Sequence, residues 1–150
     1  MHDDVRSATE LRESVMALAR QMRRHRPHTG LTLSQMELLG EASRSGVTTP
    51  AEMAARLQVR VQSLTDSINE LESRSLISRR ADPADRRRQL IEITEDGRGL
   101  LNSDRAERDA WLQATMSDNL SELEFDLLML VAPVLRKLAD SDAPTAQSSS

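Results

Sequence analysis

Three arginines stand in a row at residues 86–88, directly after the turn-forming stretch 82–85. The fixed φ of Pro83 suits the second position of a turn, and the acids beside it favour turn geometry. Because β-like runs lie on both sides, at residues 76–80 and 89–93, the sequence predicts a hairpin with the arginines at or just after its tip. Arginine is always charged and donates hydrogen bonds in a fixed fork, so a hairpin that carries arginines at its tip suits a nucleic-acid groove. The alternative is a solvated, charged hairpin end.

The segment before this hairpin has the pattern of two helices joined by a tight turn. Thr49 is predicted as the N-cap of the first helix, with Pro50 at its first position and Glu52 completing a capping box. After a short connection at residues 58–60, apolar residues recur at helical spacing. They are Val61, Leu64, Ile68 and Leu71. The sequence therefore predicts a helix-turn-helix followed at once by a basic hairpin.

The second helix of this unit carries a polar face opposite its apolar stripe. Gln62, Asp66, Asn69 and Ser73 lie on that face, and their short hydrogen-bonding side chains are the kind that read base edges in the major groove. The alternative is an ordinary solvent-facing surface. The succession of helix, turn, helix and basic hairpin favours the nucleic-acid interpretation.

These features together resemble a known family. The residues that carry the resemblance are Thr49-Pro50, Leu57, Val59, Leu64-Thr65, Leu71-Glu72, Leu76-Ile77, Arg79, Asp82-Pro83, Asp85-Arg86-Arg87, Ile91, Ile93-Thr94 and Gly97. In this order they look like the multiple-antibiotic-resistance regulator (MarR) family of bacterial winged helix-turn-helix repressors, over roughly residues 8–139.

The resemblance implies a mainly α fold with a small β-hairpin, organised as one MarR-like domain over residues 1–139. Its winged helix-turn-helix core would span about residues 32–94. Dimerisation helices would span about residues 7–25 and 95–139.

The resemblance also implies which residues contact DNA. On the recognition helix they are Arg60, Gln62, Ser63, Asp66, Ser67 and Asn69, and on the wing they are Asp85, Arg86, Arg87 and Arg88. Arg87 would reach the minor groove, oriented by Asp85. The partner would be a near-palindromic operator in double-stranded DNA, bound by a homodimer that acts as a repressor and is released by a small effector.

Three residues depart from the family pattern. Arg60 stands where a Ser or Thr N-cap is usual, and arginine cannot accept the free N–H bonds of the helix start, although it suits a phosphate. Asp66 stands where a basic residue is common; an acid repels phosphate but accepts a hydrogen bond from cytosine N4. Ser75 replaces the usual helix-ending glycine.

The distribution of charge fits a DNA-binding protein better than the net charge of −4 does. Residues 56–90 carry eight arginines against five acids, whereas residues 91–150 carry five bases against twelve acids. Such asymmetry orients a protein on a polyanion. With only one tryptophan and one phenylalanine, the chain lacks the aromatic platforms of modules that bind single strands.

We call the winged helix-turn-helix core, about residues 32–94, the reading unit. The helices outside it carry more apolar surface than so small a unit can cover. The N-terminal stripe is Leu11, Val15, Leu18 and Met22, and a longer stripe runs from Leu123 to Leu138, interrupted by Pro133. Two copies that pack these helices together would bury this surface; the alternative is a larger monomeric core. Ser121 with Glu124 is predicted as the capping box of the last helix, and Thr32 or Ser34 is predicted to open the second helix of the chain. Residues 140–150 have the composition of a disordered tail.

Catalysis finds no support in the sequence. There is no cysteine, nucleophile elbow, phosphate-cradling glycine loop or metal signature, so we expect no enzyme activity, metal site or cofactor. No signal peptide or long apolar run is apparent, so a cytoplasmic protein without membrane association is expected. The alternative to DNA binding is a winged-helix protein-interaction module.

A basic stretch between the first two predicted helices is a candidate effector site. Arg23, His25 and His28 lie there, together with Arg24 and Arg26. The resemblance implies that a small anionic or aromatic effector binds near this loop. The alternative is a solvated basic helix end, since arginine near a helix C-terminus is favourable without a ligand.

Overall fold

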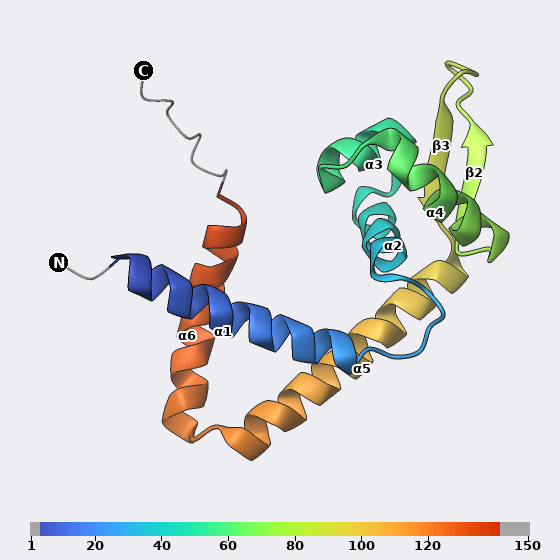
Figure 1. The fold of residues 1–150 in the computed structure, drawn as a ribbon. Coiled ribbons are helices and arrows are strands. Elements are labelled where there is room, and N and C mark those ends of the chain that lie inside the picture. Colours follow the sequence, from blue (N-terminus) through green and yellow to red (C-terminus); the bar gives the residue numbers. More distant parts are fainter. Residues whose placement is uncertain (1–3, 142–150) are drawn as a thin grey trace, which may run out of the picture. The chain divides into compact units, whose positions relative to one another are not determined.

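The computed structural model describes residues 4–141, which form six helices and three short strands (Figure 1). In chain order these are α1 (Asp4–Arg24), α2 (Leu33–Ser45), β1 (Val47–Thr48), α3 (Pro50–Leu57), α4 (Val61–Ser73), β2 (Ile77–Ala81), β3 (Gln89–Ile93), α5 (Glu95–Asn119) and α6 (Glu122–Ala139). The chain divides into two compact units within α5, between Asp109 and Ala110. The first unit contains every element from α1 to β3.

Capping boxes fix where three of the helices begin. Thr32, Thr49 and Ser121 each accept a hydrogen bond from the backbone N–H three residues on, and the Gln or Glu at that position bonds back. The predicted starts at Thr49 and Ser121 are confirmed. For α2 the sequence left Thr32 and Ser34 open, and Thr32 is the cap.

The strands form one antiparallel sheet in the order β1-β3-β2. In the β2–β3 hairpin, Ile77 pairs with Ile93 and Ala81 with Gln89, which brings residues 82–88 to the tip. We call this hairpin, residues 77–93, the wing. The predicted hairpin is confirmed, but β1 was missed, because its two residues are too few to show an alternating pattern.

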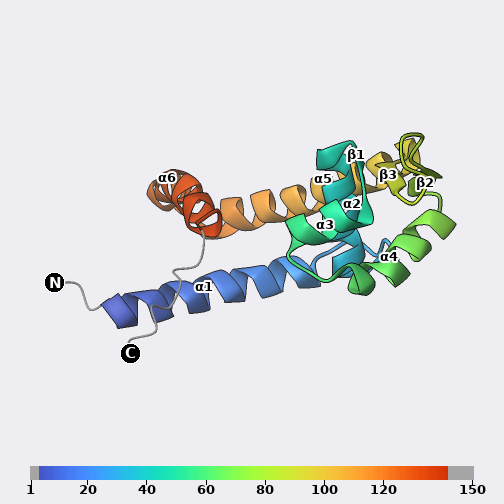
Figure 2. The same cartoon turned by 90° about the horizontal axis from the view of Figure 1, so that it is seen from above.

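The core of the first unit lies among α2, α3, α4 and the sheet. Helix α2 packs against α3, α4 and β3, and these elements lie together at one end of the view in Figure 2. Leu38, Leu39, Met53, Leu71 and Ile91 have no exposed surface. The predicted stripe of α4 holds for Leu64, Ile68 and Leu71, whereas Val61 is exposed, because it occupies the first turn beyond the edge of the core.

The first turn of α5 is fastened to the corner between α4 and β2. The Thr94 hydroxyl accepts a hydrogen bond from the Gly97 N–H at 3.0 Å, and the Thr94 N–H donates to the Leu76 carbonyl oxygen at 3.1 Å. A Cβ at Gly97 would lie 2.1 Å from that same oxygen. Only glycine allows so close an approach of helix and backbone.

The helices α1 and α6 expose long apolar side chains. On α6 no described residue is buried, and Leu123, Leu130 and Leu138 are more than half exposed. The predicted long terminal helices are confirmed, and α6 continues through Pro133. Between residues 4 and 141, none of the helices combines the length and apolar composition needed to cross a membrane. Most of the predicted tail, residues 142–150, lies outside the described residues.

Candidate nucleic-acid interface

The outer face of α4 is polar, solvent-exposed and largely free of internal hydrogen bonds. Gln62 and Asp66 are exposed, and Ser67 is half-buried at the edge of the face. Ser63 is exposed, but its hydroxyl donates to the Arg60 carbonyl oxygen at 2.6 Å. The free side chains therefore concentrate in the first half of the helix, which is the end that a helix-turn-helix inserts toward base edges.

Asn69, farther along the same face, is already engaged. Its Oδ1 accepts a hydrogen bond from Arg79 of β2 at 3.1 Å. An Asn that reads adenine in the bidentate mode uses both its oxygen and its nitrogen. In this arrangement the Nδ2 group of Asn69 and one lone pair of its oxygen remain for an outside partner.

The N-terminus of α4 lacks a side-chain cap. Arg60 occupies the N-cap position with extended backbone, and no side-chain hydrogen bond satisfies the helix start. The expectation that Arg60 does not cap this helix is confirmed, and no other side chain supplies the cap. Free N–H groups at a helix start, next to an exposed guanidinium, form an arrangement that favours a phosphate.

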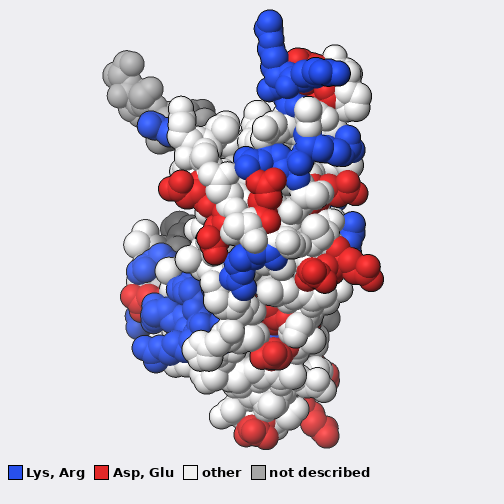
Figure 3. Space-filling model, turned by 90° about the vertical axis from the view of Figure 1, so that its right-hand side faces the viewer, with Lys and Arg blue, Asp and Glu red and all other residues white. Residues whose placement is uncertain are grey.

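The wing tip is shaped by its two aspartates. Asp82 Oδ1 accepts the Ala84 N–H at 2.9 Å, and Asp85 Oδ1 accepts the Arg87 N–H at 3.1 Å. Asp85 thus bonds to the backbone of Arg87, and no ion pair between Asp85 and a guanidinium is recorded in residues 4–141. Figure 3 shows basic side chains projecting from the top of the wing, with acidic side chains beside them.

The three consecutive arginines of the wing differ in their surroundings. Arg86 and Arg87 are exposed, and no partner for either is found in the described part of the chain. Arg88 Nη2 lies 3.5 Å from Glu52 Oε1 on α3, and both side chains are about half exposed. Arg86 and Arg87 are therefore the free cations of the tip, while Arg88, the last residue of the tip loop, contacts the helix-turn-helix through Glu52.

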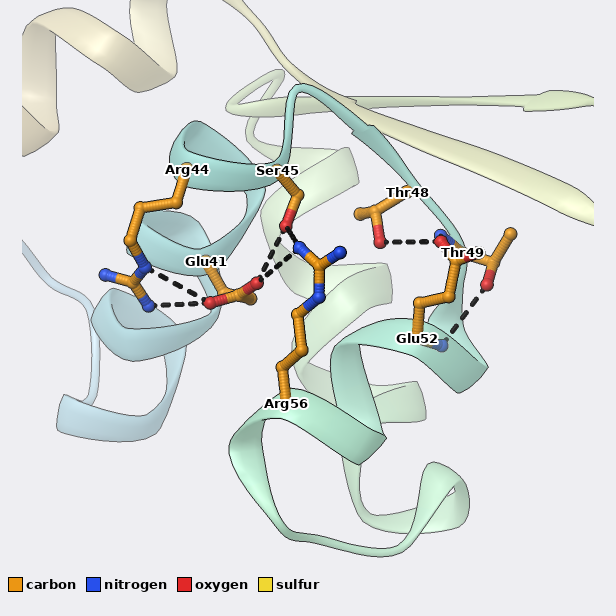
Figure 4. A network of polar contacts seen from close by, with 7 residues as sticks. All are labelled: Glu41, Arg44, Ser45, Thr48, Thr49, Glu52 and Arg56. Atoms are coloured by element: carbon orange, nitrogen blue, oxygen red, sulfur yellow. Dashed lines mark hydrogen bonds and ion pairs between the residues drawn. The ribbon is translucent and has the colours of Figure 1, made fainter. Parts of the chain in front are cut away.

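A buried carboxylate joins α2 to α3 behind this surface (Figure 4). Glu41 accepts hydrogen bonds from Arg44 Nη2 at 2.7 Å, from the Ser45 hydroxyl at 2.7 Å and from Arg56 Nη1 at 3.2 Å. Burial by itself would raise the pKa of Glu41, but the hydrogen bonds from Ser45, Arg44 and Arg56 outweigh it and lower that pKa. Glu41 is therefore ionised at neutral pH and fixes α3 against α2.

The basic stretch predicted as an effector site lines a hollow of about 420 Å³ between α1 and α2, which we call the loop hollow. Arg23 and His28 line it, together with Arg24 and Arg26. His25 is not among its lining residues, and its Nδ1 lies 2.9 Å from the Gln21 carbonyl oxygen. The structure thus brings together two of the three predicted residues.

A second cavity, of about 410 Å³, lies between α2 and α5 and was not predicted. We call it the α2–α5 cavity; it is lined by Arg26, Leu33, Met36, Glu37, Gly40, Arg44, Leu57, Leu101, Asp104, Arg105 and Arg108. Asp104 is 1% exposed, and its Oδ2 lies 2.6 Å from Arg108 Nη2. That pairing lacks hydrogen-bond geometry, so both carboxylate oxygens lack a hydrogen bond, as does the buried Nη2 of Arg26. Buried polar groups without hydrogen bonds call for a partner.

Two cross-links were also missed by sequence reasoning, namely Arg79 to α4 and Arg88 to Glu52. A single charged residue in a strand or cap gives no local sign of its long-range partner. Among the described residues, no group of histidine, aspartate and glutamate side chains could hold a metal ion.

The chain is similar to known transcriptional regulators in sequence and in structure. A model of the MarR family matches residues 31–88. A helix-turn-helix-type transcriptional regulator of Mycobacterium bovis is 32% identical over 140 residues, which cover 93% of this chain and 97% of the relative.

Solved structures are similar over almost the whole chain. One from Pseudomonas aeruginosa, assigned as a transcriptional regulator, is 33% identical with a TM-score of 0.81, covering 95% of this chain and 99% of that chain. A mutant of Escherichia coli MarR complexed with operator DNA is 21% identical with a TM-score of 0.64, covering 92% of this chain and 97% of that chain. The latter likeness concerns the fold alone.

Proposed function

The chain belongs to the MarR family of helix-turn-helix transcriptional regulators, and we propose that it is a homodimeric repressor of a near-palindromic operator, released by a small anionic or aromatic effector. In this proposal the first half of α4 enters the major groove and the wing enters the adjacent minor groove. The interface comprises Arg60, Gln62, Ser63, Asp66, Ser67, Asn69, Asp85, Arg86, Arg87 and Arg88.

One observation carries this proposal. The polar side chains of α4 without internal partners lie on the unit that also presents the free cations Arg86 and Arg87. Specific DNA binding needs side chains that contact base edges and side chains that contact phosphates, and this unit presents both kinds. Escherichia coli MarR, a protein of similar fold, was solved in complex with operator DNA, and this supports DNA as the partner.

Selection of bound sequences from random duplex DNA tests the proposal. We expect a near-palindrome with half-sites about 10 base pairs apart, and binding that weakens steeply as salt rises. Arg87→Ala should weaken binding to all duplexes and lower the salt slope by about one, whereas Gln62→Ala should act mainly on the selected sequence. Absence of any duplex preference would favour a protein-interaction module instead.

Dimerisation is supported by the exposed apolar faces of α1 and α6. Leu127 and Val134 of α6 are both more than half exposed, and an uncovered stripe of this length marks an interaction site. In sedimentation, Leu127→Arg should shift the protein to monomer and abolish operator binding. Asp126→Arg, which introduces the same side chain beside it on the charged side of α6, should remain a dimer.

Effector release is supported by the α2–α5 cavity. Its arginines suit an anion, its apolar residues suit an aromatic ring, and the buried Nη2 group of Arg26, which lacks a hydrogen-bond acceptor, suits a polar group of a ligand. A panel of aromatic carboxylates should include compounds that raise the melting temperature and weaken operator binding. Arg105→Ala should remove both effects if the ligand sits in this cavity, and His28→Ala should remove them if it sits in the loop hollow. Arg98→Ala, on α5 outside both, is the control.

Repression is tested with a reporter under the selected operator. Deleting the protein should raise expression, and adding a compound that weakens binding should do the same in the presence of the protein. A fall in expression on deletion would identify an activator.

A further inference from the structure

Arg79 is held differently from the arginine that follows it. It lies in the middle of β2, paired across the sheet with Ile91. Because side chains alternate along a strand, Arg79 points to the same face as the buried Ile77, and Arg80 points to the other. Arg79 is 27% exposed at the side chain, whereas Arg80 is exposed and has no recorded partner in residues 4–141.

The guanidinium of Arg79 bonds to two residues of α4. It donates to Asn69 Oδ1 at 3.1 Å, and it forms an ion pair with the Glu72 carboxylate. Asn69 and Glu72 are three residues apart, so they lie on the same side of the helix. The Nη2 group of Arg79 therefore bridges two residues one turn apart on α4 and links that turn of the helix to β2.

The wing has a second polar contact with the helix-turn-helix. Nη2 of Arg88, the residue before β3, lies 3.5 Å from Oε1 of Glu52 on α3. Both of these side chains are about half exposed, so the interaction is weak. The Arg79 pairing, less exposed and supported by a hydrogen bond to Asn69, is the stronger of the two ties in the described part of the chain.

A guanidinium already neutralised by a carboxylate is poorly suited to contact DNA directly. Counterion release requires a cation that meets a phosphate, and Glu72 would have to leave Arg79 first. What the pairing does is hold two separate elements, α4 and the wing, at one mutual angle. A protein that must engage two neighbouring grooves at once needs that angle fixed before it binds.

We propose that Arg79, acting through Glu72 and Asn69, is a positioning residue that sets the wing against α4, so that both elements dock on DNA together. This inference rests on the proposed interface. Without the Arg79 contact, only the shared apolar core and the short α4–β2 connection hold the wing to α4, and Arg87 contributes less to operator binding. The hydrogen bond from Arg79 turns the Asn69 amide oxygen toward β2, so Asn69 serves the geometry of the interface.

The test is a double-mutant cycle on the selected operator. Arg87→Ala is measured in the parent, in Arg79→Gln and in Arg80→Gln, which removes the same charge from the adjacent position. In the parent and in the Arg80→Gln background, we expect Arg87→Ala to weaken binding about tenfold or more, as the loss of a wing contact should. In the Arg79→Gln background the further loss should be under about threefold, because contacts that act as a unit are not additive.

Glu72→Gln separates positioning from simple electrostatics. Removing an acid near DNA should tighten binding if only charge matters. If Glu72 holds Arg79, the same variant should weaken operator binding and should also suppress the effect of Arg87→Ala. Circular dichroism and thermal melting show which variants are folded, and Arg79→Lys provides a milder change if Arg79→Gln unfolds.

The outcomes are distinct. If Arg87→Ala has no effect in the parent, both the interface and the inference are wrong. If Arg87→Ala weakens binding equally in all backgrounds, or if Glu72→Gln binds more tightly, the interface stands and the positioning role of Arg79 is overturned.

Discussion

The hydroxyl of Thr94 donates a 2.7 Å hydrogen bond to the carbonyl oxygen of Ser75. Ser75, two residues after the end of α4, has a positive φ of 58°, and Thr94 directly precedes α5. One side chain therefore joins the turn after α4 to the start of α5. Any rotation of α5 at this end is passed to the α4–β2 corner through this bond and through the close packing of Gly97.

The first prediction concerns that packing. Gly97→Ala places a Cβ 2.1 Å from the Leu76 carbonyl oxygen and 2.9 Å from Ile93 Cγ1, so backbone must move. We expect a loss of about 2 kcal/mol or more in the free energy of unfolding, measured by urea titration.

Gly99→Ala is the matched control in the same helix. Nothing lies within 4 Å of a Cβ at that position. Because alanine is the better helix former, this variant should gain about 0.5–1 kcal/mol. Equal effects of the two substitutions would contradict the tight approach at Gly97.

The second prediction concerns the uncapped start of α4. Arg60→Ser should supply the missing acceptor and raise the free energy of unfolding by about 1 kcal/mol. If Arg60 meets a phosphate, the same variant should bind DNA more weakly, with a salt slope lower by about one.

Arg60→Ala distinguishes the two effects. It removes the cation without providing a cap, so DNA binding should fall as in Arg60→Ser while stability does not rise. A stable Arg60→Ser variant with unchanged salt slope would remove Arg60 from the interface.

The third prediction concerns acid stability. The folded-state pKa of Glu41 lies below its ordinary value of 4.5. The ionised carboxylate therefore stabilises the folded state above about pH 4.5, and this contribution is lost as pH falls through the folded-state pKa. Glu41→Gln should destabilise the protein by about 1–3 kcal/mol at pH 7 and should flatten the decline of stability below pH 4.5.

The matched control is Glu37→Gln, on the exposed side of the same helix. We expect it to leave both the stability at pH 7 and the slope at acid pH close to those of the parent. Unfolding by guanidinium chloride at a series of pH values measures both quantities. An acid slope that Glu41→Gln leaves unchanged would show that the network in Figure 4 does not depend on the charge of Glu41.

The fourth prediction concerns Asp66, an exposed acid on the outer face of α4 without a recorded partner in the described residues. If its carboxylate accepts a hydrogen bond from cytosine N4, Asp66→Asn should lose about 1–3 kcal/mol of discrimination at one symmetric pair of operator positions. Binding to random duplexes should become tighter, because a negative charge is removed. Selection with both proteins compares the two preferences, and identical selected sequences would exclude base reading by Asp66.

The parts of the fold that were predicted correctly depend on local chemistry. Thr49-Pro50 and Ser121 mark helix starts within a few residues of sequence, and the hairpin of the wing follows from its turn and the two short β-like runs beside it. The missing cap at Arg60 was visible for the same reason. These features require no knowledge of what packs against them.

The parts that were missed depend on contacts between distant residues. Arg79 and Glu72 are seven positions apart in different elements. Arg26 precedes the reading unit and Asp104 follows it, and both line the α2–α5 cavity. Val61 fits the helical period of its stripe but lies beyond the edge of the core. Periodicity gives the direction in which a side chain points, and only the assembled fold shows whether anything is there to cover it.

The bare apolar face of α6 also has a consequence for how the protein responds to dilution. A helix with no buried side chain in one copy gains its stability from whatever covers it. If a second copy does so, folding and association are one equilibrium, and the melting temperature rises with protein concentration. The number of molecules in the cell would then govern both the occupancy of the operator and the lifetime of the folded chain, so that a sparsely expressed copy is lost to proteolysis sooner than an abundant one.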